Sequence, residues 1–165
     1  MEYLVWVEET SFSIWMRESG PAFFGSLILH SVAMGFVAGV HVALDLRILG
    51  LAPRIPLSLM RRFFPVLRVS LIAVVVSGVL LLVAYPGKAL TNEVFYLKLA
   101  IVAAALYITR WLTNRVLQDP SCDSGLIPAR SRWLAAVSLV LWAGAITSGR
   151  FLAYTHNMMM ASHQY

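Results

Sequence analysis

Four histidines are the side chains of this sequence best suited to chemistry: His30, His41, His156 and His163. His30 and His41 lie within the uncharged stretch 19–44, which is long enough to cross a membrane as one helix. On such a helix they point within about 20° of each other, about 16 Å apart along the axis. Histidines on one face of an apolar helix are typical of four-helix b-type cytochromes, in which neutral imidazole binds haem iron. In the alternative interpretation, each ring hydrogen-bonds a neighbouring helix and binds nothing, although ionisable side chains inside a membrane usually indicate a function.

His156 is the candidate for a second axial ligand. It follows the fourth apolar stretch, and the sequence predicts that it lies on the same side of the membrane as His30. Arg150 and Arg17 are expected on that side too, where either guanidinium could pair with a haem propionate. For His41, nearer the opposite side, a structural role is slightly favoured because no other histidine of the chain is expected there. The predicted cofactor is therefore haem b, with His30 and His156 as metal ligands and His41, Arg150 and Arg17 as further binding residues.

The C-terminal tail indicates a second, less favoured chemistry. Residues 156–163 combine two histidines with Met158, Met159 and Met160, and imidazole and thioether ligands suit Cu(I). Three adjacent methionines cannot all face one ion from a helix, so copper handling or transport is only an alternative. The sequence contains no nucleophile–base constellation, glycine-rich phosphate loop or carboxylate pair, so a non-catalytic role is favoured over an enzyme.

The composition indicates that lipid is the solvent of this chain. Hydrophobic residues make up 59% of the 165 residues and charged residues 13%, whereas a soluble domain carries about a quarter charged residues. The formal net charge of +5 comes from basic residues between the apolar stretches, which argues against nucleic-acid binding. The lone cysteine, Cys122, excludes a disulfide framework within the chain.

Four apolar stretches predict an all-α, integral membrane four-helix bundle that forms a single domain, 1–165. The spans are expected near 21–46, 65–86, 94–117 and 132–155, because a span needs about 20 residues. Helices are expected because lipid offers the backbone no other hydrogen-bond partners. Residues 1–18 interleave large apolar side chains with acidic ones and are predicted to lie on the outer membrane surface. Pro56 is expected to start a short helix on the inner surface.

Arginines predict the orientation of the helices. Two of the connecting segments hold Arg47, Arg54, Arg61, Arg62, Arg68, Arg110, Arg115, Arg130 and Arg132. The connection between them in sequence has only Lys88 against Glu93, and the N-terminal segment is acidic. Because positively charged loops stay in the cytoplasm, both termini are predicted outside, in a multi-pass protein of the inner (plasma) membrane.

Small residues predict where the helices pack. Gly35 and Gly39 form a GxxxG pair, which is expected to contact another helix of the same bundle; a homodimer through these glycines is the alternative. A second stripe consists of Ser70, Ser77 and Ala84, and a third lies near the outer end of the last span, with Ala143, Gly144, Ser148 and Gly149. At the inner end of the first span, Asp45 is expected to form an ion pair with Arg47 or Arg110, because an unpaired carboxylate there is costly.

Several short motifs follow one another along the chain: Arg17-Glu18-Ser19, then His30, then the 45–50 segment D-L-R-I-L-G, and finally the 149–154 segment G-R-F-L-A-Y. In these motifs the chain resembles a family of small bacterial four-helix membrane proteins of unknown function. The 95–98 segment F-Y-L-K is similar to the start of the family's third helix. The family supplies no activity, but the resemblance implies that these residues belong to a shared design; His41 and the His/Met tail depart from the family pattern.

These observations lead to two main functional hypotheses. The favoured one is a b-type haem-binding, electron-transferring subunit of a larger respiratory or dehydrogenase complex. The other is a haem-free accessory subunit that fills a helix interface in such a complex. The expected partners are the lipid bilayer and other membrane or peripheral subunits, and no nucleic acid.

Overall fold

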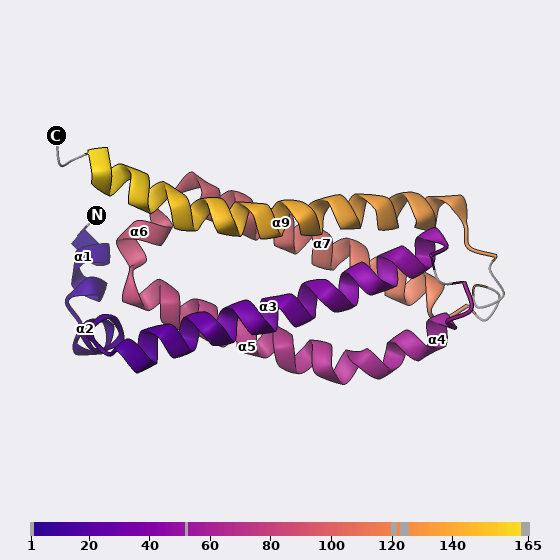
Figure 1. The fold of residues 1–165 in the computed structure, drawn as a ribbon, viewed down its shortest axis with the longest axis horizontal. Coiled ribbons are helices and arrows are strands. Elements are labelled where there is room, and N and C mark those ends of the chain that lie inside the picture. The colour runs from indigo at the N-terminus through magenta and orange to yellow at the C-terminus, as the bar shows by residue number, and fades with distance from the viewer. Residues whose placement is uncertain (1, 52, 120–121, 123–125, 163–165) are drawn as a thin grey trace. The chain divides into compact units, whose positions relative to one another are not determined.

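The computed structural model describes residues 2–51, 53–119, 122 and 126–162, without the side chains of 150 and 152–162. Its helices are α1 Glu2–Glu8, α2 Ser11–Glu18, α3 Gly20–Leu49, α4 Leu57–Met60, the 3₁₀ turn η1 Arg61–Phe63, α5 Phe64–Ala84, α6 Pro86–Leu90, α7 Glu93–Val116 and α9 Ala129–Ser162 (Figure 1). The described residues include no strand. The all-α fold predicted from the sequence is therefore confirmed.

Four helical segments are long and apolar enough to cross a membrane, as predicted. They are Gly20–Leu49, Leu57–Ala84, Glu93–Val116 and Ala129–Gly149. The short helix expected at Pro56 is present as α4, with Pro56 as its N-cap, and two further short helices, α1 and α2, occupy the N-terminal segment. α9 continues through Ser162, beyond the predicted end of the last span near residue 155.

The first span has a recognisable start and stop. The Ser19 hydroxyl accepts a hydrogen bond from the Ala22 backbone N–H (3.4 Å), so Ser19 caps the N-terminus of α3. Gly50 ends the helix with φ at 104°. The Gly50 N–H donates to the Arg47 carbonyl (3.1 Å), and the Leu51 N–H to the Leu46 carbonyl (3.0 Å). This is the Schellman pattern, which satisfies the last carbonyls and favours glycine because φ is positive.

The chain forms two compact units. The first contains residues 1–40 and 62–92, and the second contains residues 41–61 and 93–165. α3 contributes its first two thirds to one unit and its last turns to the other. We call them the first unit and the second unit and describe each by itself.

In the first unit, the two N-terminal helices dock on the end of α5 through polar contacts. The buried Ser13 hydroxyl donates to the Val83 carbonyl (2.8 Å). The Arg17 guanidinium donates to Ser13 Oγ (3.2 Å), and to the backbone carbonyls of Ala84 (3.2 Å) and Glu8 (2.7 Å). These bonds tie α1 and α2 to the unit, so the N-terminal segment has a fixed partner in addition to any lipid surface.

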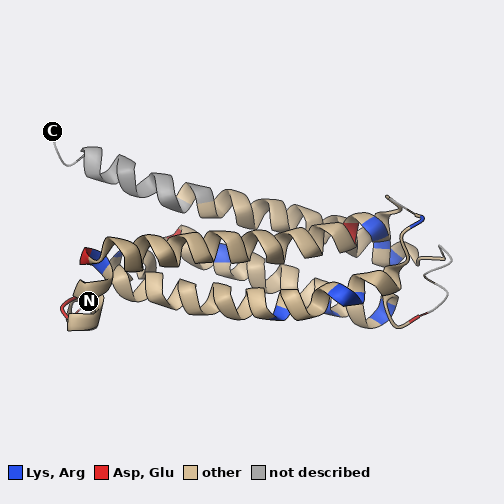
Figure 2. Ribbon diagram, turned by 60° about the horizontal axis from the view of Figure 1, so that its bottom comes forward, with Lys and Arg blue, Asp and Glu red and all other residues tan. Residues whose placement is uncertain are grey.

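In the second unit, α7 and α9 pack against each other as antiparallel neighbours, and Figure 1 shows α9 running alongside α7. A Cβ added to Gly144 would lie 3.9 Å from Ile101 Cδ1, and one added to Gly149 would lie 3.7 Å from Lys98 Nζ. Gly144 and Gly149 therefore pack against α7 and Ser148 is buried, as predicted, whereas Ala143 of the same predicted stripe is exposed. In Figure 2, basic residues of this unit gather where α7 ends and α9 begins.

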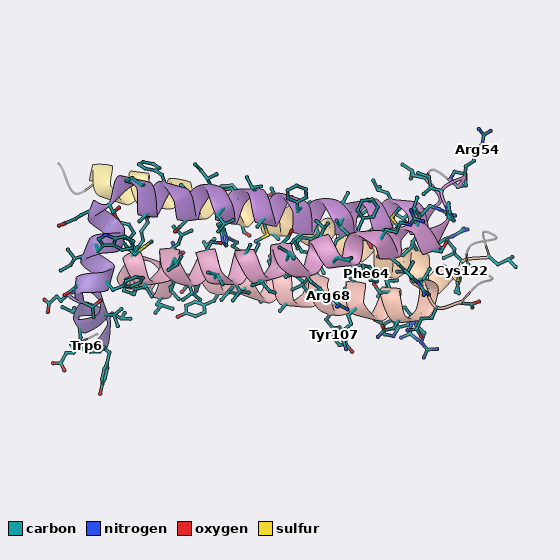
Figure 3. The ribbon with its side chains drawn as sticks, turned by 90° about the horizontal axis from the view of Figure 1, so that it is seen from below. Trp6, Arg54, Phe64, Arg68, Tyr107 and Cys122 are labelled. Carbon is teal, nitrogen blue, oxygen red and sulfur yellow. The ribbon has the colours of Figure 1, made fainter. Side chains whose placement is uncertain are left out.

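The outward faces of the long helices are apolar. Exposed side chains include Phe24 on α3, Ile72 on α5, Tyr107 on α7 and Val140 on α9. Tyr107 is 74% exposed and points away from its helix in Figure 3, as does Trp6 on α1, which is 69% exposed. Such faces suit contact with lipid chains rather than with water.

The GxxxG pair is the packing prediction that was wrong. Gly35 and Gly39 are exposed, and a Cβ added to either meets open space among the described residues. The stripe on α5 behaves as predicted, because Ser70, Ser77 and Ala84 are all buried. Glycine spacing alone cannot tell which face of an all-apolar helix meets a neighbour, and this explains the error.

Candidate functional site

His30 of α3 is anchored to α5 through one ring nitrogen. Its Nδ1 lies 3.2 Å from the Val74 backbone carbonyl and 3.1 Å from Ser77 Oγ. The Ser77 hydroxyl donates to the Ala73 carbonyl at 2.5 Å, which orients its lone pairs away from that carbonyl. His30 is half-buried at this point of the first unit.

The acceptors around His30 favour one neutral tautomer. A backbone carbonyl only accepts hydrogen bonds, and the Ser77 hydroxyl has the Ala73 carbonyl as an acceptor of its own, so a hydrogen on His30 Nδ1 suits both neighbours. In that neutral tautomer the lone pair is on Nε2. Histidines that bind metals usually donate their other ring N–H to a carbonyl or carboxylate in this way. The donor chemistry of His30 is thus compatible with an axial ligand as well as with a helix-to-helix link.

Gly78 permits the close approach of His30 to α5. A Cβ at position 78 would lie 3.3 Å from His30 Cε1 and 3.6 Å from His30 Nδ1. This is tighter than ordinary van der Waals contact, so the His30 ring would have to shift by a few tenths of an ångström to accept even a methyl group at position 78. Sequence reasoning missed Gly78, Val74 and Ser77 as partners of His30, although a buried histidine needs an acceptor near its N–H.

His41 has different surroundings in the second unit. It is 3% exposed and stacks on Trp142, with ring centroids 4.7 Å apart and planes at 28°. Trp142 is fully buried and is the largest buried side chain among the described residues. The stack gives His41 a packing role, which is the role slightly favoured from the sequence. Trp142 was not predicted as its partner.

Arg17 is held by the contacts described above, and its guanidinium also lies 6.0 Å from the centre of the Tyr85 ring. Lys88 lies 5.7 Å from the same ring, and partial burial lowers the pKa of Lys88. Pairing of Arg17 with a haem propionate would therefore compete with three hydrogen bonds inside the first unit. The structure describes neither the side chains of Arg150 and His156, which were predicted to complete the haem site, nor those of the His/Met tail.

The ion pair predicted for Asp45 is not formed. Asp45 is fully buried, and neither carboxyl oxygen has a hydrogen-bond partner among the described residues. Arg47 donates instead to the backbone carbonyls of Ile55 (2.5 Å) and Pro53 (3.2 Å), and Arg110 is exposed. The prediction failed because the loop after α3 offers carbonyls that hold the Arg47 guanidinium.

The part of the chain that the structure describes also contains no group of three or more His, Cys, Asp or Glu side chains arranged to hold a metal ion.

Comparison of the chain with protein-family models, with curated proteins and with solved structures gave no match in any of the three. The function therefore has to be argued from the chain's own residues.

Proposed function

We propose that this chain is a multi-pass subunit of a bacterial inner membrane that holds a b-type haem through His30. In this role it passes electrons within a larger respiratory or dehydrogenase complex. The observation that carries the proposal is the contact of His30 Nδ1 with the Val74 carbonyl, because metal-binding histidines usually donate their other ring N–H to a carbonyl or carboxylate in this way. The bound haem would supply reversible one-electron exchange at its iron.

The residues around His30 have defined parts in this proposal. Val74 and Ser77 orient the ring and make its nitrogen a better electron donor, and Gly78 leaves room for the ring against α5. The second ligand remains the sequence prediction of His156. A haem-free accessory subunit is the competing function, and the same bond supports it, since His30 would then simply link α3 to α5.

The haem content of variants tests the proposal. We expect His30→Ala to abolish the Soret band of the full-length protein purified from haem-sufficient cells, because the ligand is lost. Ser77→Ala should retain haem and shift the midpoint potential, because one partner of the ring N–H is removed while the ligand stays. The matched control is His163→Ala, which changes a histidine in the tail and should leave the spectrum unchanged. Full haem retention in His30→Ala would exclude His30 as the ligand.

The proposed orientation has both termini outside, and it rests on the arginines of the inner connections. In a Cys122→Ser background, Leu126→Cys should react with a membrane-impermeant thiol reagent only from the cytoplasmic side, and Thr91→Cys only from the outside. Both native side chains are exposed, so accessibility to the reagent is expected. The opposite pattern of labelling would reverse the topology.

A further inference from the structure

Four buried polar side chains of the second unit lack hydrogen-bond partners among the described residues. Their unpaired atoms are both carboxyl oxygens of Asp45, Thr109 Oγ1, Ser138 Oγ and Trp142 Nε1. Asp45, Ser138 and Trp142 are 0% exposed and Thr109 is 5% exposed. We call these four residues the polar cluster. Unpaired buried polar groups are rare because each costs its full desolvation, so four in one unit require an explanation.

The helix register places the polar cluster together. His41 of α3 stacks on Trp142 of α9. Asp45 lies one turn after His41 on α3, and Ser138 lies one turn before Trp142 on α9. The Ser138 hydroxyl approaches the Asp45 carboxyl group without reaching hydrogen-bonding geometry. α3 and α9 are therefore antiparallel here, with two successive turns in contact.

α7 supplies the fourth member of the polar cluster. Ile101 of α7 faces Gly144 of α9 in an antiparallel pair. Because the two helices are antiparallel, a step forward along α7 corresponds to a step back along α9. Two turns after Ile101 on α7 is Thr109, and two turns before Gly144 on α9 is a position within about one turn of Ser138. By this register the buried residues Asp45, Ser138 and Thr109 lie within about one turn of one another along the second unit.

The charged groups around the polar cluster do not neutralise Asp45. On its own helix, Arg47 is bound to the carbonyls of the following loop. On α7, Arg110 is exposed. On α9, Arg132 is exposed and Arg130 lies over the Trp111 ring, 5.2 Å from its centre. The remaining titratable neighbour is His41, whose ring is stacked on Trp142.

A bare carboxylate at this site would be strongly unfavourable. Burial of an uncompensated ionised group in an apolar interior costs several kcal/mol or more, so such groups bind a counter-charge. Carboxylate and hydroxyl oxygens are ligands for hard cations. A single carboxylate matches a single positive charge, whereas Ca²⁺ is held by six to eight oxygens, usually including several carboxylates.

We propose that Asp45 is an exchangeable site for a monovalent cation, a proton or a sodium ion, with the Ser138 and Thr109 hydroxyls as its polar neighbours. Binding makes the carboxyl group neutral and allows it to remain buried, and release leaves a charge that favours access of water. The site lies in the second unit and does not depend on haem binding at His30. Such a site would couple cation uptake to the exclusion of water from the interior of the second unit.

Two measurements on the full-length protein in lipid vesicles test this proposal and separate the two cations. The first is thermal stability in sodium chloride against choline chloride at equal ionic strength. The second is the infrared C=O band of a protonated carboxylic acid at neutral pH. We expect a sodium-dependent rise in the melting temperature if the site holds Na⁺, or the protonated-acid band without a sodium response if it holds a proton. Asp45→Asn, which has nearly the same shape, should remove whichever signal the wild type shows.

The control variant is Asp119→Asn, because Asp119 is an exposed carboxylate just beyond α7; both signals should survive this change. Ser138→Ala provides a second test that keeps the carboxyl group. It should raise the half-saturating sodium concentration about tenfold, as expected for loss of one polar contact to a charge, or shift the frequency of the acid band. A wild type with neither signal, or signals that persist unchanged in Asp45→Asn, would overturn the proposal.

Discussion

Trp142→Ala should lower the free energy of unfolding by about 3–5 kcal/mol, as is typical for removal of a large buried aromatic side chain. The indole is fully buried in the second unit and stacks on His41, so its loss leaves a cavity and an unsupported imidazole. In lipid, helix association depends on van der Waals packing rather than on the hydrophobic effect, so the lost contacts are not replaced. Reversible unfolding in mixed micelles, followed by circular dichroism, measures the change.

Trp133→Ala is the matched control for this prediction. Trp133 lies on the same helix, α9, and is 69% exposed, so its replacement should change the free energy of unfolding by less than about 1 kcal/mol. If the two variants were equally stable, Trp142 would not be a packing centre of the second unit.

Gly78→Leu should destabilise the first unit by about 1–3 kcal/mol or more, the usual cost of overpacking. A Cβ alone would already lie 3.3 Å from His30 Cε1 and 3.6 Å from His30 Nδ1, and the larger leucine side chain should strain the contact of the ring with the Val74 carbonyl. The variant should therefore lose stability and bound haem together. Thermal unfolding and the absorption spectrum of the same preparation measure both effects.

Gly39→Leu makes the same substitution where a Cβ meets open space among the described residues. It should leave the stability of the monomer nearly unchanged, in contrast to the loss expected if Gly39 packed within the chain. A fall in stability with protein dilution, abolished by this variant, would instead support the homodimer through Gly35 and Gly39. Equal destabilisation by Gly78→Leu and Gly39→Leu would contradict the packing described for α3.

The spans could be predicted from the sequence because hydropathy and helix-end residues are local signals. Ser19 and Gly50, both part of the family-like motifs, prove to be the N-cap of α3 and its left-handed terminator. Pro56 at the start of α4 and Pro65 in the first turn of α5 follow the same logic. These residues act through the backbone of their own helix, so no knowledge of tertiary contacts is needed.

The rotation of each helix about its axis could not be predicted. Helices that are apolar on every side carry no stripe that identifies the buried face. For this reason Gly39 was expected to be packed and is exposed. The ion pair expected for Asp45 failed for another reason, because Arg47 binds the carbonyls of the loop after α3. The partners of His30 and the stack of His41 on Trp142 depend on the same rotations. The sequence therefore predicted which histidines belong to the candidate site, but not which side chains and carbonyls they contact.

The reduced-minus-oxidised absorption spectrum of the full-length wild-type protein, purified from haem-sufficient cells, tests the central claim most directly. We expect a Soret band and a reduced α-band typical of b-type haem, which disappear in His30→Ala. A pure, folded preparation without either band would contradict haem binding, and His30 would then serve only to join α3 to α5.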